Sequence, residues 1–183
     1  MSMQLSNERY EQIKESVVQL YEQCDVHCTP ISGYEIAVRL GVKVIPYSAL
    51  SAANRSKALR FSNDGFSAFE NGEWRICVND DSSIVYGRIN FTLLHEIGHI
   101  WLKHTEASDL ADAEADFFAK FAQCPPVLIY KYGLTNVGQI MNRFEISYGA
   151  ACNAFDYYHK WLRYGSRNYT DYEIKTCRLF GVA

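Results

Sequence analysis

Phe91-Thr92-Leu93-Leu94-His95-Glu96-Ile97-Gly98-His99-Ile100-Trp101-Leu102 is a mostly apolar stretch that carries the pattern H-E-x-x-H. On an α-helix, residues four apart are rotated by only about 40° and rise about 6 Å, so the imidazoles of His95 and His99 can reach one metal ion. Glu96 lies about 100° round the helix from His95, where a general base beside the metal is needed. The stretch therefore predicts a metal site on a helix, with Glu96 as its base.

A catalytic zinc site needs a third protein ligand. The longer pattern H-E-x-x-H-x-x-G-x-x-H is absent, because Leu102 stands at its glycine position and Thr105 at its last histidine. We therefore interpret His104 as a solvated residue near the helix end, turned away from His99. The remaining candidates are carboxylates that follow the motif: Glu106, Asp109, Asp112, Glu114 and Asp116.

The helix predicted over residues 109–123 supplies the best of these carboxylates. Glu114 stands between two alanines, small enough for two helices to approach closely, and near the face that carries Phe118. Spacing alone favours Glu114 as the third ligand, with Asp112 as the alternative. A helix start with solvated acids, which the helix dipole favours, explains the same residues without a metal.

The rest of the chain predicts one α+β domain. Residues 1–41 hold an amphipathic helix over 6–23 and a short second helix, where Ser32 and Glu35 form a capping box. Residues 42–79 form a small, mainly antiparallel sheet, with strands at 42–47, 58–61, 66–69 and 74–78. The metal-site helices, residues 83–103 and 109–123, occupy residues 80–124. Residues 125–183 form a C-terminal region with helices at 127–132, 136–144 and 147–164 and an irregular end.

Composition is that of an ordinary soluble protein, with 48% apolar and 21% charged residues and a net charge of −3. This charge is too small to attract nucleic acid or an anionic membrane to the whole molecule. No apolar stretch has the length of a membrane span, and no export signal is evident, so we expect a cytoplasmic protein. In that compartment the six cysteines are expected to be free thiols.

The motif residues resemble the ImmA/IrrE family of bacterial and phage metallopeptidases. The resemblance rests on Arg88, on residues 91–99, on the stretch Glu114-Ala115-Asp116-Phe117-Phe118-Ala119 and on Pro125. It implies a zincin-like fold with Zn²⁺ on His95, His99 and Glu114, and Glu96 as the general base. This chain departs from the family pattern at Asp116, where the family usually has Asn.

The first function predicted is that of a zinc-dependent endopeptidase. The resemblance implies a specific cytoplasmic substrate protein, such as a helix-turn-helix repressor. The alternative is a non-proteolytic regulatory zinc protein that acts by contact, but such a protein has no physical need for Glu96. Direct nucleic-acid binding through residues 135–163 is disfavoured, because the second helix of that region has no Lys or Arg over residues 147–158 to aim at bases.

Overall fold

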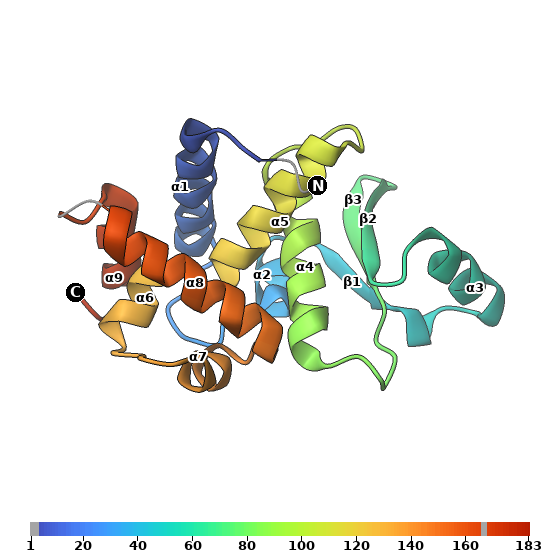
Figure 1. The fold of residues 1–183 in the computed structure, drawn as a ribbon. Coiled ribbons are helices and arrows are strands. Elements are labelled where there is room, and N and C mark those ends of the chain that lie inside the picture. Colours follow the sequence, from blue (N-terminus) through green and yellow to red (C-terminus); the bar gives the residue numbers. More distant parts are fainter. Residues whose placement is uncertain (1–3, 166–167) are drawn as a thin grey trace. The chain divides into compact units, whose positions relative to one another are not determined.

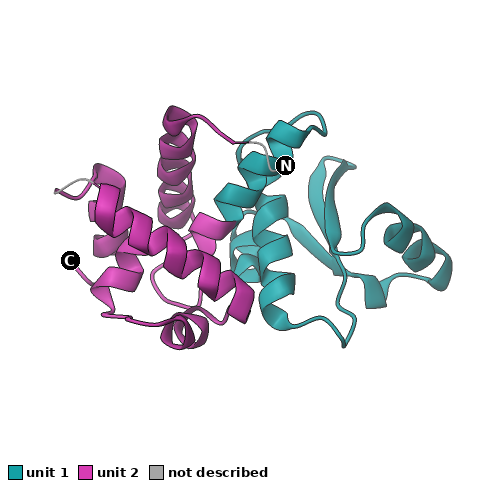
Figure 2. Cartoon of the chain, viewed as in Figure 1, with its two compact units in different colours: residues 1–3, 32–119 teal, residues 4–31, 120–183 magenta. Residues whose placement is uncertain are grey.

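The chain divides into two compact units in the computed structural model, which describes residues 4–165 and 168–183. Among these residues, unit 1 comprises 32–119, and unit 2 comprises 4–31 and 120–183 (Figure 2). Unit 1 combines helices with a small sheet, whereas the regular elements of unit 2 are helices (Figure 1). The α+β class is therefore confirmed.

Unit 1 is built on a three-stranded sheet with the order β1-β3-β2, made of β1 (Lys43–Pro46), β2 (Gly65–Glu70) and β3 (Glu73–Val78). Its helices are α2 (Gly33–Arg39), α3 (Ala52–Phe61), α4 (Tyr86–Trp101) and α5 (Asp109–Gln123) as far as Ala119, with a single 3₁₀ turn, η1 (Tyr47–Ala49). Ser32 caps α2, as predicted, by accepting a hydrogen bond from the backbone N–H of Glu35 at 3.2 Å.

One predicted strand of the sheet was wrong. Residues 58–61 are the end of helix α3, not a strand. Ser51 caps this helix by accepting a hydrogen bond from the backbone N–H of Asn54, and the Ala, Lys, Leu and Arg residues that follow are strong helix formers. The sheet is mixed: β2 and β3 form the antiparallel hairpin with six residue pairs, while β1 pairs with β3 in parallel over four, a pairing that was not predicted.

Unit 2 consists of α1 (Asn7–Gln23), α6 (Pro126–Lys131), α7 (Val137–Phe144), α8 (Tyr148–Tyr164) and α9 (Asp171–Leu179), together with the last turn of α5. Tyr21 of α1 is fully buried, and its hydroxyl donates to the carbonyl oxygen of Ala122 at 2.5 Å. Its ring also meets that of Phe180 edge to face. These contacts join the first helix to the C-terminal region.

The predicted irregular C-terminus was also wrong, because residues 171–179 form α9. A capping box starts this helix: the side chain of Thr170 accepts from the backbone N–H of Glu173, and the Glu173 carboxylate accepts from the backbone N–H of Thr170 at 2.8 Å. Within residues 4–165 and 168–183, no helix combines the length and the apolar character that a membrane span requires.

Candidate metal centre

Helix α4 carries the H-E-x-x-H motif and lies close to the hairpin of unit 1. Gly65, the first residue of β2, has no room for a side chain: a Cβ there would lie 2.7 Å from Cγ2 of Thr92 on α4 and 2.7 Å from the carbonyl oxygen of Cys77. A glycine is therefore required where the strand meets the helix. This close approach brings β2 beside the motif.

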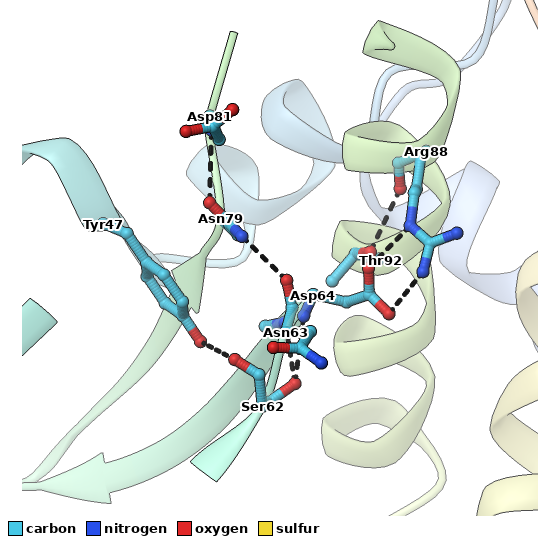
Figure 3. A network of polar contacts seen from close by, with 9 residues as sticks. Tyr47, Ser62, Asn63, Asp64, Asn79, Asp81, Arg88 and Thr92 are labelled. Atoms are coloured by element: carbon cyan, nitrogen blue, oxygen red, sulfur yellow. Dashed lines mark hydrogen bonds and ion pairs between the residues drawn. The ribbon is translucent and has the colours of Figure 1, made fainter. Parts of the chain in front are cut away.

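Polar contacts tie the start of α4 to the turn before β2 (Figure 3). The Arg88 guanidinium donates to both carboxylate oxygens of Asp64, at 2.6 and 2.8 Å. The Thr92 hydroxyl donates to the Arg88 carbonyl at 3.0 Å, and the Asn79 amide donates to the Asn63 carbonyl at 2.8 Å. This bidentate ion pair links α4 to the turn. Arg88, one of the motif residues of the family resemblance, therefore has a structural contact in this molecule.

Helix α5 packs against α4 at Gly98, inside the motif. A Cβ at Gly98 would lie 3.0 Å from Cδ1 of Phe118 and 3.4 Å from Cα of Ala115. Both α5 residues are fully buried. Because the glycine allows this contact, the first turns of α5 lie beside the two motif histidines.

Three donor groups converge between these helices. The Nε2 atoms of His95 and His99 lie 3.1 Å apart, and Oδ1 of Asp112 lies 3.5 Å from Nε2 of His99. His95, His99 and Asp112 each offer one ligand atom, and these atoms all lie within 4.8 Å of one another. The structure therefore brings together both predicted histidines and the carboxylate that spacing placed second.

These distances fit a metal ion. Zinc holds imidazole nitrogen and carboxylate oxygen at about 2.0–2.2 Å in a tetrahedral arrangement, so two of its ligand atoms lie about 3.3–3.5 Å apart. The Nε2–Nε2 separation of 3.1 Å and the Nε2–Oδ1 separation of 3.5 Å are close to this value. The Asp112 side chain is 66% exposed, whereas that of His99 is only 19% exposed, so the group is open to solvent on the carboxylate side. An open side is what a catalytic site requires.

Asp116 supports one of the histidines. Its Oδ1 lies 3.1 Å from Nδ1 of His95. With a proton on Nδ1, His95 donates to this carboxylate and presents the lone pair of Nε2 to the metal position. Asp112 and Asp116 lie four residues apart on α5, so one face of the helix supplies both carboxylates. The departure from the family pattern at Asp116 thus retains a hydrogen-bond acceptor for His95.

Glu96, the predicted base, is buried beside the donor group. It is 8% exposed, and its Oε2 accepts a hydrogen bond from the Ser67 hydroxyl of β2 at 2.8 Å. Burial raises the pKa of Glu96, and the Ser67 hydrogen bond and the charge of His95 only partly oppose this. A carboxylate with a raised pKa holds a proton more readily than a free one, as general acid–base catalysis requires.

The pKa values of the two histidines are shifted in opposite directions. Burial lowers the pKa of His99 to about 4, with help from the charges of His95 and His104, so His99 is neutral at pH 7 and can bind a metal. Burial also acts to lower the pKa of His95, but the Asp116 hydrogen bond and the nearby carboxylates outweigh it, and the pKa lies above its usual value.

Glu114, the third ligand preferred from the sequence, contacts a different histidine. Its Oε2 lies 3.0 Å from Nε2 of His104, and it is not part of the group of three donors. The interpretation of His104 as a solvated residue was wrong, because its side chain is only 12% exposed and its Nδ1 lies 2.9 Å from Nδ1 of His99. The cause is the chain reversal after α4, where Lys103 adopts a left-handed conformation with φ of 60°.

Ser67 was not predicted to have a role, and Asp116 was considered only as one of the candidate carboxylate ligands and as a departure from the family pattern. Ser67 belongs to a strand whose register against α4 depends on tertiary packing, so no local signal marks it. The four-residue spacing between Asp112 and Asp116 is such a signal, because it places two carboxylates on one helix face. Comparisons of the chain with protein-family models, curated proteins and solved structures give no match.

Proposed function

We propose that the chain is a zinc-dependent peptidase, in which His95, His99 and Asp112 hold the ion and Glu96 is the general base. The observation that carries this proposal is a converging group of two imidazoles and one carboxylate, with which the buried Glu96 carboxylate interacts electrostatically through His95 and Asp112. Two imidazoles with a single carboxylate suit zinc better than magnesium or calcium, which prefer oxygen ligands.

Zinc at this position supplies Lewis acidity, which polarises a peptide carbonyl and makes a water molecule more acidic. The protein supplies the proton transfer. Glu96 accepts a proton from the attacking water and passes it to the amine that leaves. Ser67 holds one oxygen of Glu96, so the carboxylate keeps a defined orientation on the hairpin side of α4.

The placement of α4 beside a small sheet and the resemblance of its motif to the ImmA/IrrE family together support a zincin-like domain. The same resemblance favours a specific protein substrate, of the helix-turn-helix repressor type, over general digestion. Exposed Tyr148, Leu162 and Tyr164 on α8 offer apolar surface for contact with such a protein.

The test is a cleavage assay with zinc-loaded full-length protein, using a helix-turn-helix repressor encoded beside the gene as substrate and casein as the general substrate. Glu96→Gln keeps the shape of the side chain but cannot accept the proton, so it should retain zinc and lose cleavage by about 10²–10⁴-fold. Glu35→Gln is the matched control, since Glu35 is exposed on α2, and should cleave as the wild type does.

Chelator-sensitive cut sites in the repressor that are missing with Glu96→Gln support the proposal. Wild-type cleavage rates in Glu96→Gln would remove this residue from the mechanism. A stable complex of wild-type protein and repressor, with zinc bound and no cut, would instead favour the regulatory protein that acts by contact.

A further inference from the structure

The turn after α4 folds His104 back onto the motif. The backbone N–H of His104 donates to the His99 carbonyl at 3.0 Å, and that of Lys103 donates to the Ile100 carbonyl at 3.2 Å. With Lys103 in the left-handed conformation, these bonds form the Schellman motif that ends many helices. Helices that end in this motif usually have glycine at the left-handed position, so Lys103 holds a strained backbone where the chain reverses. The result is that a second imidazole lies against His99.

A chain of hydrogen bonds starts at His99 and ends on α5. Nδ1 of His99 lies 2.9 Å from Nδ1 of His104, and Nε2 of His104 lies 3.0 Å from Oε2 of Glu114. The side chains of His104 and Glu114 are 12% and 9% exposed, so water has little access to them. Buried polar groups are costly unless they are paired, and these groups satisfy one another.

With a metal on Nε2 of His99, these contacts allow only one placement of the protons. If Nε2 of His99 is a metal ligand, its proton must be on Nδ1, and His104 must accept that proton's hydrogen bond through a bare Nδ1. The proton of His104 is then on Nε2, where it donates to the Glu114 carboxylate. Each neutral imidazole has one donor and one acceptor nitrogen, so one arrangement satisfies the whole chain.

His95 is oriented in a similar way, but by one carboxylate directly. Its Nδ1 faces Asp116, while its Nε2 faces Nε2 of His99. We propose that His104 and Glu114 are positioning residues that hold His99 in its metal-binding tautomer and orientation. This inference rests on the proposed function, since it concerns a ligand of the same ion. It gives Glu114 a role behind the histidines and leaves Asp112 as the third ligand.

The test measures zinc binding to the full chain by competition with a chromophoric chelator, for pairs of variants. His104→Phe keeps a ring but has no nitrogen, whereas His104→Asn retains an oxygen that can accept from Nδ1 of His99. Loss of a group that orients a ligand weakens metal binding by about 10–100-fold. We therefore expect that loss in His104→Phe and recovery of most of it in His104→Asn. His27→Phe, at an exposed histidine, is the matched control and should bind zinc as the wild type does.

A second measurement separates a positioning role from direct ligation. Asp112→Asn and Glu114→Gln are compared by the visible absorption of bound Co²⁺, which reports the donor atoms of the site. Asp112→Asn should shift the bands, while Glu114→Gln should leave them in place, because the glutamine oxygen can still accept from His104. Glu114→Leu should weaken zinc binding more than Glu114→Gln does.

Several results would overturn the inference. One is a zinc dissociation constant of His104→Phe within twofold of the wild-type value. Another is a shift of the Co²⁺ bands by Glu114→Gln as large as that caused by Asp112→Asn, which would make Glu114 itself a ligand. Equal losses of zinc affinity and metal-free melting temperature in His104→Phe and His104→Asn would show a general packing role. Wild-type protein that binds no zinc would remove the proposed function as well, whereas the other results leave it standing.

Discussion

Gly98→Ala tests the helix contact that brings the metal donors together. The added methyl group would lie 3.0 Å from Cδ1 and 3.3 Å from Cγ of Phe118, closer than the 3.5–4.0 Å of ordinary carbon contacts. Phe118 is fully buried and cannot move into solvent. Overpacking of this kind costs about 1–3 kcal/mol, and the better helix propensity of alanine returns about 1 kcal/mol. We expect a net destabilisation of about 0–2 kcal/mol.

Because this net value is small, a double-mutant cycle with Phe118→Leu gives the sharper measurement. In the Phe118→Leu background the methyl group has room, so Gly98→Ala should stabilise by up to about 1 kcal/mol. The coupling between the two changes should therefore be about 1–3 kcal/mol, measured by urea unfolding followed by circular dichroism. Effects that add to within about 0.5 kcal/mol would refute the close contact of α4 with α5.

Three further predictions concern Asp116, which is the hydrogen-bond partner of His95, the turn at Lys103 and the cysteine thiols. Asp116→Leu removes the acceptor for His95 and should weaken zinc binding by about 10–100-fold, while Asp116→Asn, which keeps an oxygen, should weaken it much less; equal losses would contradict this. Lys103→Gly relieves the left-handed backbone and should stabilise by up to about 1 kcal/mol in thermal unfolding with unchanged zinc affinity, so a loss of stability would count against the turn described. Burial raises the pKa of the Cys124 thiol, so its thiolate is scarce at pH 8 and iodoacetamide should label the exposed Cys28 first; peptide mass spectrometry that finds Cys124 labelled as fast would disprove this.

Local patterns predicted the elements that carry the site. The motif helix and the helix over residues 109–123 were expected from their sequence patterns, and both are present as α4 and α5, although α4 begins after Val85, which makes no side-chain cap. The parallel pairing of β1 with β3 was not expected, because hairpin signals report only neighbouring strands. Helix α9 was missed, although Thr170 and Glu173 have the spacing of a capping box.

Helical spacing in the sequence does not identify which carboxylate is the third ligand of the proposed site. Ala115 of α5 faces Gly98, and Asp112 lies about 60° round the helix on one side of it, while Glu114 lies about 100° round on the other. Both carboxylates therefore flank the packed face, and the spacing that favoured Glu114 kept Asp112 as the alternative. The turn at Lys103 places His104 on the Glu114 side, and this contact favours Asp112 in the proposed site. Nothing in the sequence marks this turn, since the residue is not a glycine.

The most direct test of the metal centre is a crystal structure of the zinc-loaded protein, with anomalous diffraction data collected at the zinc absorption edge. We predict one strong anomalous peak per chain, within about 2.0–2.2 Å of Nε2 of His95, Nε2 of His99 and a carboxylate oxygen of Asp112. Glu114 should remain hydrogen-bonded to His104. A peak coordinated by Glu114 in place of Asp112, or no peak between the two motif histidines, would contradict the metal centre proposed for this chain.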